Sequence, residues 1–302
     1  MKIYLISALL LVATFCNGQE SPNFLWLVCE DQSLFFSMYG DSSAHTPNIN
    51  QLAKDGLVYQ NCHTPSPVCA PSRSSLITGM YPTTLGTQHM RAYKKSAAKN
   101  AINAHNSLPY YNAKPKKPVR FFTEDLRANG YYCSNNAKED YNMPGSPLAW
   151  DESSREAHWR NREEGQAFFS VFNFNITHES RIWKNETTYS KEELDNVRIP
   201  DFFPEDDGIK SDFLTNYKNI EKLDQQIGVI IAQLKADGLY DNTIIFFFSD
   251  HGGPFPHYKR SIYETGLRCP MVAKWNDDAW KGKTYQLVSF VDFAPTILDA
   301  AN

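Results

Sequence analysis

The sequence predicts an α/β fold in which helices cover the faces of a large, mostly parallel central sheet. Short apolar runs alternate along the chain with segments of helical period. The runs are apolar at nearly every position, so both faces of each strand are expected to be buried. Strands that are buried on both faces and separated by helices are typical of parallel sheets.

The first predicted elements are a strand and a helix. The run NFLWLVC at residues 23–29 is apolar and has the length of a buried strand. A helix follows from Thr46-Pro47, because proline is favoured in the first helical turn, and it is expected to end near Gly56.

The middle of the chain supplies a helix and two strands. Residues 121–129 have a helical pattern that stops at Gly130, and a strand is expected at residues 131–134. The run AFFSVFNF at residues 167–174 is predicted to form another buried strand.

The clearest predicted helix spans residues 211–236 and is followed by a strand at residues 243–248. Apolar side chains recur through the helix with its period of 3.6 residues. They are Phe213, Leu214, Tyr217, Ile220, Leu223, Ile227, Ile230, Ile231 and Leu234. The strand, TIIFFF, is apolar on both faces.

The N-terminus predicts export. Met1-Lys2, an apolar run at residues 3–15 and Gly18 are typical of a secretory signal peptide over residues 1–18. The run is too short to span a bilayer comfortably, and no later stretch reaches that length. We therefore expect a secreted or periplasmic protein without a membrane span.

Composition and cysteine content narrow the function classes. The net charge is -4 and no basic stripe is present, so no nucleic-acid partner is expected. Removal of the signal peptide leaves an odd number of cysteines without the paired spacing of zinc sites, and at least one of them cannot form an internal disulfide. Cys29, Cys133 and Cys269 are expected to be buried as small hydrophobic residues.

Acidic residues follow the first and last of these predicted strands. Glu30 and Asp31 follow one strand, and Asp250 and His251 follow the other. The carboxyl ends of parallel strands meet at one edge of a sheet, so these groups can converge. Gathered carboxylates favour a divalent cation, and oxygen ligands favour Ca²⁺ or Mg²⁺ over zinc. Acidic residues after strands are also common helix caps, and that alternative stays open.

The stretch SPVCAPSRSSLITG places Cys69 where a turn becomes a helix. Pro71 and Ser72 are typical of a helix start, with Ser72 able to cap it, and the helix is expected to end before Gly79. A helix N-terminus lowers a thiol pKa and stabilises an anion, and Arg73 adds a positive charge. The sequence therefore predicts an anion site here.

The segment CAPSRSSLITG resembles the signature C-x-P-S-R-x-x-x-[LM]-T-G of the sulfatase family, with Ile77 as a departure. The segments PNFLWLVCEDQS, FFFSDHGG, KRSIYETGLRCPMV and VSFVDFAPTILDAA are similar to other family elements, so the resemblance covers about residues 22–301. It is strongest to bacterial-type heparan and N-sulfoglucosamine sulfohydrolases. It implies an alkaline-phosphatase-like three-layer αβα sandwich at residues 22–302, without the family's smaller C-terminal domain.

The resemblance also implies site residues. One Ca²⁺ would be bound by Glu30, Asp31, Cys69, Asp250 and His251, where Glu30 replaces the usual aspartate. The implied catalytic residues are Cys69, Arg73, Lys138, His178, Lys259 and Asp140, the last standing where the family often has histidine. A formylglycine-generating or sulfatase-maturing enzyme would oxidise Cys69 to Cα-formylglycine, whose hydrate supplies the nucleophilic hydroxyl.

The function implied by this resemblance is that of an exported sulfatase acting on a sulfated carbohydrate, either an O-sulfate ester or an N-sulfate. Two alternatives remain open at this point. One is a phosphate or phosphonate monoester hydrolase of the same superfamily. The other is a relative without catalytic activity that binds sulfated glycans.

Overall fold

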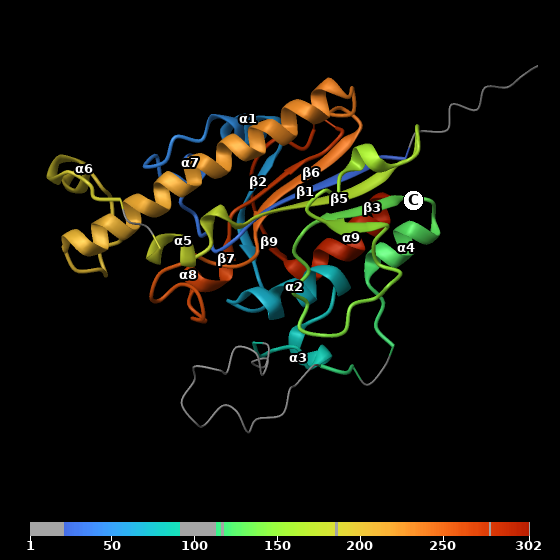
Figure 1. Cartoon of the computed structure of the whole chain (residues 1–302), viewed down its shortest axis with the longest axis horizontal. Coiled ribbons are helices and arrows are strands. Elements are labelled where there is room, and N and C mark those ends of the chain that lie inside the picture. The colour runs from blue at the N-terminus through green and yellow to red at the C-terminus, as the bar shows by residue number, and fades with distance from the viewer. Residues whose placement is uncertain (1–20, 91–112, 116–117, 185–186, 278, 302) are drawn as a thin grey trace, which may run out of the picture.

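The computed structural model describes residues 21–90, 113–115, 118–184, 187–277 and 279–301 (Figure 1). The predicted signal peptide at residues 1–18 lies outside this part of the chain. Among the described helices, none is both long enough and apolar enough to cross a bilayer.

The described strands form one sheet in the order β4-β3-β5-β1-β6-β8-β2-β7, with β9 paired to β2. They span Asn23–Cys29 (β1), Leu57–His63 (β2), Tyr132–Asn136 (β3), Glu152–Ser154 (β4), Phe168–Phe174 (β5), Thr243–Ser249 (β6), Arg268–Cys269 (β7), Met271–Lys274 (β8) and Gly282–Ser289 (β9). The central strand β1 is parallel to both β5 and β6, and β3 is parallel to β5. Only β7 and β8 run against their neighbours within this described sheet, so the predicted mostly parallel sheet is confirmed.

Two apolar cores lie on opposite faces of this sheet. Side chains of β1 alternate between them, because successive residues of a strand point to opposite faces. Phe24 and Trp26 join the core with helices α2 (Cys69–Thr78), α4 (Phe122–Ala128) and α9 (Phe293–Ala300). Leu25 and Leu27 join the core with α1 (Pro47–Asp55) and α7 (Asp207–Ala236). Figure 1 shows the resulting layers of helix, sheet and helix, as predicted.

Shorter helices lie in the connections. The α-helical ones are α3 (Pro82–Leu85), α5 (Ser180–Trp183), α6 (Lys191–Asp195) and α8 (Glu264–Leu267). The 3₁₀ turns are η1 (Ser37–Tyr39), η4 (Trp159–Asn161), η5 (Asn175–Thr177) and η6 (Phe290–Asp292). The connection η5–α5 follows β5 and therefore lies at the same sheet edge as the ends of β1 and β6.

The long helix α7 begins one turn earlier than the apolar pattern predicts. The Asp206 carboxylate accepts hydrogen bonds from the backbone N–H groups of Gly208 (2.8 Å) and Ile209 (3.3 Å). This N-cap satisfies donors that a helix start leaves unpaired. The first turn of α7 contains a single apolar residue, Ile209, which is too few to show a helical period. The periodic pattern of apolar residues therefore starts about one turn after the helix does.

The described cysteines all carry free, buried thiols. Cys29, Cys133 and Cys269 are fully buried among apolar side chains, which confirms that they serve as small hydrophobic residues. Burial raises the pKa of each of these three thiols, so they stay protonated. Cys69 differs from them, as the site geometry shows.

Candidate active site

The ends of β1 and β6 bring the two acidic segments together. Cys29 of β1 lies beside Ser249 of β6, so Asp31 and Asp250 leave neighbouring parallel strands at one edge. The Asp31 N–H donates to Oδ1 of Asp250 (3.2 Å), and the Gln32 N–H donates to Oγ of Ser249 (2.8 Å). Asp31 adopts a left-handed backbone with φ of 54°, which turns the chain back toward β6.

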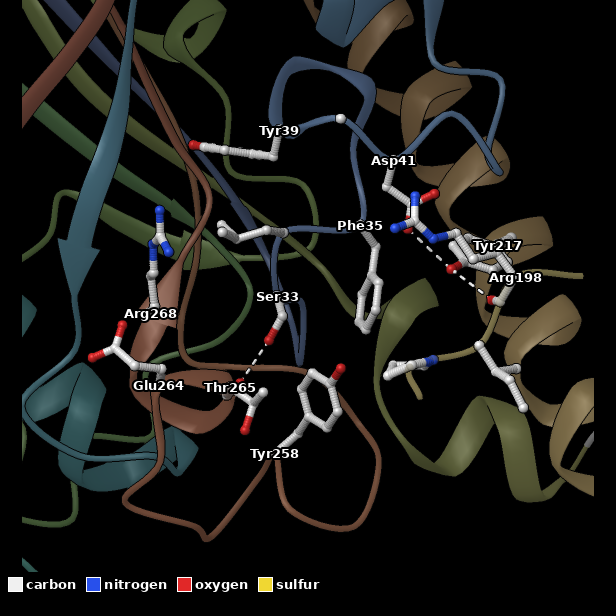
Figure 2. Close-up of a pocket in the computed structure, with 14 residues that line it drawn as sticks. Ser33, Phe35, Tyr39, Asp41, Arg198, Tyr217, Tyr258, Glu264, Thr265 and Arg268 are labelled. Atoms are coloured by element: carbon white, nitrogen blue, oxygen red, sulfur yellow. Dashed lines mark hydrogen bonds between the residues drawn. The ribbon is translucent and has the colours of Figure 1, made fainter. Parts of the chain in front are cut away.

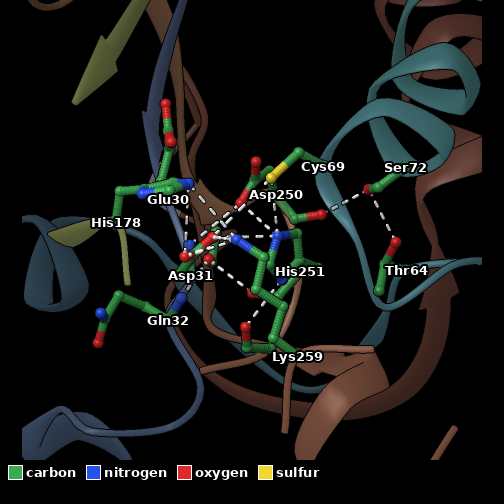
Figure 3. Close-up of polar contacts among 12 residues, drawn as sticks. Glu30, Asp31, Gln32, Thr64, Cys69, Ser72, His178, Asp250, His251 and Lys259 are labelled. Atoms are coloured by element: carbon green, nitrogen blue, oxygen red, sulfur yellow. Dashed lines mark hydrogen bonds and ion pairs between the residues drawn. The ribbon is translucent and has the colours of Figure 1, made fainter. Parts of the chain in front are cut away.

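The helix α2 points its N-terminus at this edge (Figure 3). It begins at Cys69, with Val68 as the N-cap residue, so the prediction that Ser72 caps the helix is wrong. The buried Ser72 hydroxyl instead donates to the backbone carbonyl of Asp250 and receives a hydrogen bond from the Thr64 hydroxyl (2.8 Å). Ser72 therefore fastens α2 to the end of β6 and fixes where Cys69 lies.

The Cys69 side chain lies among histidine and carboxylate groups and is only 2% exposed. Its Sγ is 3.2 Å from Nε2 of His251 and 4.0 Å from Oδ1 of Asp31. Burial and the charge of Asp250 act to raise the pKa of this thiol. The charge of His251 and hydrogen bonds with His178 and His251 outweigh them and lower it to about 7.

The acidic side chains form a buried cluster, and within it the ligand atoms of Asp31, Cys69 and His251 lie within 4.8 Å of one another, close enough to hold a metal ion. Glu30, Asp31 and Asp250 are each at most 2% exposed. Nε2 of His251 faces Oδ1 of Asp31 (3.1 Å) and Oδ1 of Asp250 (3.6 Å). Its other ring nitrogen lies 2.9 Å from the Gly252 carbonyl, an arrangement that is typical of a metal-bound histidine. The carboxylate oxygens are the ligand type that Ca²⁺ prefers, and the imidazole adds one nitrogen donor.

Basic side chains surround this cluster. Each of its carboxylates has a cationic partner: Lys259 Nζ with Asp31 Oδ2 (2.8 Å), Arg73 Nε with Asp250 Oδ2 (3.1 Å) and Lys138 Nζ with Glu30 Oε2 (2.9 Å). Nη2 of Arg73 is buried and has no hydrogen-bond partner among the described residues. It is therefore a donor available to a ligand.

His178 and Asp140 lie at the border of the site. Nε2 of His178 is 3.5 Å from Nζ of Lys259 and 3.9 Å from Oδ2 of Asp31, and its side chain is 29% exposed. A hydrogen bond with Cys69 raises the pKa of His178, although burial opposes it. Asp140 is half-buried, and its negative charge is among the causes that hold the pKa of Arg73 above its usual value.

Two further residues of the site are not among those predicted from the sequence. Glu179 is 5% exposed, and its Oε1 lies 3.2 Å from Nζ of Lys259. Its backbone N–H also donates to Oδ2 of Asp31 (2.7 Å). Asn173 at the end of β5 accepts a hydrogen bond from Nη1 of Arg73 (2.7 Å). The clue to Glu179 in the sequence is its position directly after the predicted site residue His178.

A family model described as Sulfatase matches residues 22–302. The chain belongs to the sulfatase family. The resemblance that the signature around Cys69 indicated is thereby confirmed. The roles that the resemblance assigns to single residues stay predictions, although the structure places these side chains side by side.

The curated sulfatases that match extend well beyond the aligned part. An ulvan-active sulfatase from Formosa agariphila is 42% identical over 95% of this chain and 53% of its own length. Human N-sulphoglucosamine sulphohydrolase is 24% identical over 97% of this chain and 63% of its own length. The chain thus spans about half to two thirds of the length of these relatives.

A solved structure described as a 2-O GAG sulfatase aligns over 93% of this chain and 71% of its own, with a TM-score of 0.67 and 16% identity. At 16% identity, the similarity between the two structures establishes a shared fold and no more. The predicted alkaline-phosphatase-like architecture is therefore confirmed.

Proposed function

We propose that this chain acts as an exported sulfatase that hydrolyses sulfate groups of a carbohydrate, with residue 69 as the nucleophile after its conversion to formylglycine. The observation that carries the proposal is the position of Cys69. It lies at the N-terminus of α2, 3.2 Å from His251 and within a ring of buried acidic and basic side chains. The export signal at residues 1–18 belongs to the same proposal.

The acidic cluster would hold the calcium ion through Glu30, Asp31, Asp250 and His251, together with the oxygen of the converted residue 69. Calcium, when bound, supplies a positive charge that lowers the pKa of a hydroxyl group and compensates the buried carboxylates. Formylglycine supplies, as its hydrate, a hydroxyl nucleophile in place of a thiol. A sulfatase-maturing enzyme is the partner that this conversion requires.

The basic side chains would bind and orient the sulfate group. The ammonium group of Lys138 pairs with Glu30 of the acidic cluster, and the ammonium group of Lys259 pairs with Asp31. Positive charges fixed in a buried site stabilise the charge that develops on sulfate oxygens during transfer. The N-terminus of α2 and Nη2 of Arg73, which has no hydrogen-bond partner among the described residues and lies 3.9 Å from Oε1 of Glu30, add donors near the acidic cluster.

His178 is the residue best placed to donate a proton to the leaving oxygen. Its side chain is 29% exposed, whereas that of Lys259 is 2% exposed and bonds both oxygens of Asp31. A group at the open side of the site can meet the departing sugar and exchange protons with solvent. Lys259 therefore serves as the fixed charge, and His178 as the general acid.

A sulfated carbohydrate is the proposed substrate class. The ulvan-active relative aligns over nearly the whole of this chain, and the human relative is named for an N-sulfated sugar. Sulfated ulvan oligosaccharides are therefore the first substrates to test, and an N-sulfated glucosamine is the second.

The test measures inorganic sulfate released by protein produced together with a maturing enzyme, using an aryl sulfate and ulvan oligosaccharides. Cys69→Ala is expected to abolish release, whereas the matched control Cys133→Ala changes a buried thiol outside the site and retains it. Sulfate release that survives in Cys69→Ala would contradict the proposal. Faster hydrolysis of an aryl phosphate would favour a phosphate or phosphonate esterase, and glycan binding without hydrolysis would favour a glycan-binding protein.

A further inference from the structure

A cavity of about 330 Å³ lies beside the loop that follows Asp31 (Figure 2). Its walls come from residues 33–41, residues 198–200, α7 and residues 258–268. Among its described lining residues, none belongs to the proposed metal or catalytic set. The Ser33 hydroxyl connects the cavity wall with the segment that follows His251. It donates to the Thr265 carbonyl (2.6 Å) and accepts from the N–H of Gly253 (2.8 Å).

Aromatic rings form one wall of this cavity. The ring centroids of Phe35 and Tyr258 are 5.6 Å apart with an interplanar angle of 32°. Both side chains are at least nine-tenths buried, so packing holds their positions. The parts of these rings that reach the cavity make its wall rigid and apolar, and apolar walls combined with a few polar groups are typical of ligand sites.

The acidic side chains of the cavity already have partners. Oδ2 of Asp41 accepts a hydrogen bond from the Tyr217 hydroxyl (3.0 Å), and its Oδ1 accepts one from the Ser43 N–H (3.0 Å). Glu264 pairs with His63 at 3.2 Å. These carboxylates are therefore less available to a ligand than the cationic groups of the cavity.

The two arginines of the cavity are available. Nε of the half-buried Arg268 donates to the Gln60 carbonyl (2.6 Å), which leaves its terminal nitrogens for the cavity. Within the described residues, no carboxylate forms an ion pair with Arg198 or Arg268. Figure 2 shows these arginines on opposite sides of Phe35 and Tyr258. Guanidinium groups bind carboxylate and sulfate through paired N–H donors.

We propose that this cavity binds an anionic sugar unit, a hexuronate or a sulfated hexose, as a site separate from the catalytic one. The anionic group pairs with Arg268 or Arg198, and the C–H groups of the sugar lie against the apolar wall to which Phe35 and Tyr258 contribute. The cavity volume lies within the range of small-molecule sites. The choice of a sugar rests on the proposed function, because an enzyme that acts on sulfated glycans encounters such units at high local concentration.

The test is calorimetric titration of the protein with a hexuronate disaccharide that carries no sulfate. At least one of Arg198→Gln and Arg268→Gln is expected to weaken binding roughly tenfold, because the arginine that pairs with the anion supplies charged hydrogen-bond donors. Arg155→Gln, an exposed arginine outside the cavity, is the matched control. Arg198 is also exposed, so its variant is expected to fold, and thermal unfolding checks both variants.

Unchanged affinity in both variants, absence of binding, or equal affinity for lactose would overturn the proposal. Binding of a monosulfated hexose disaccharide that depends on the same arginines would support it and assign sulfate as the anion. Sulfate release from an aryl sulfate is expected to be unchanged in Arg198→Gln. Arginine-dependent binding by a protein that releases no sulfate would refute the proposed function and leave the cavity assignment standing.

Discussion

Glu179 contacts two basic residues, Lys259 in the site and the exposed Arg260 beside it. Its carboxylate contacts Nζ of Lys259 (3.2 Å) and forms a bidentate pair with Arg260 (2.6 and 2.8 Å). The charges of Arg260 and Lys259 are among the causes that hold the pKa of Glu179 below its ordinary value, although burial acts to raise it. Glu179 therefore acts as a positioning residue for Lys259.

We expect Glu179→Gln to lower kcat/KM for sulfate release by roughly tenfold or more. The substitution keeps the shape of the side chain but removes one of the two carboxylate charges beside Lys259, the other being Asp31, and a hydrogen bond to a charged group contributes about 1.5–3 kcal/mol. Steady-state kinetics on an aryl sulfate measures the change. Glu192→Gln on the exposed side of α6 is the control. Equal kcat/KM in both variants would show that Glu179 does not position Lys259.

The residues of the site differ in how far the sequence reveals them. Cys69 and Arg73 lie in one continuous signature, so local pattern is enough to find them. Asp31 and Asp250 follow apolar strands, and their pairing follows from sheet topology. Glu179 meets Arg260 across 81 positions of sequence, and no strand or helix pattern predicts that contact.

At the scale of the elements, α1 depends on α7 for its N-terminus. Thr46 makes no side-chain cap to α1. Instead, the buried Asp224 of α7 accepts hydrogen bonds from the backbone N–H of Ile49 (2.8 Å) and from the side-chain amide of Asn48 (2.8 Å). A Cβ on Gly228 would lie 2.7 Å from the Asn48 side chain, so the two helices approach closely there. The local pattern around Pro47 predicts the helix but not this partner.

We expect Asp224→Ala to lower the free energy of unfolding by about 1–3 kcal/mol, because buried N–H donors of α1 lose their acceptor. Urea unfolding monitored by circular dichroism measures the change. Gln225→Ala, at the next and exposed position of α7, is expected to leave the unfolding midpoint nearly unchanged. A loss in Asp224→Ala no larger than in that control would contradict the assigned contact.

At the scale of the whole molecule, the predictable part of the fold is the part buried on both sides. β1, β5 and β6 are buried at nearly every position, and the apolar runs predict each of them within one residue of its observed bounds. The edge strand β9, GKTYQLVS, has no continuous apolar run that would predict it. Its side chains are largely exposed, with Tyr285 at 75% and Leu287 at 77%. β8 runs antiparallel to β6, and apolar periodicity does not report the direction of a strand.

The central claim is that the buried thiol at the N-terminus of α2 is the precursor of the nucleophile. The most direct measurement is the mass of the peptide that contains residue 69, taken from protein produced with a maturing enzyme. We predict a lighter peptide in which the thiol has been replaced by an aldehyde, and capture of that peptide by an aldehyde-reactive hydrazide. An intact Cys69 thiol, under conditions that convert a reference sulfatase, would contradict the account.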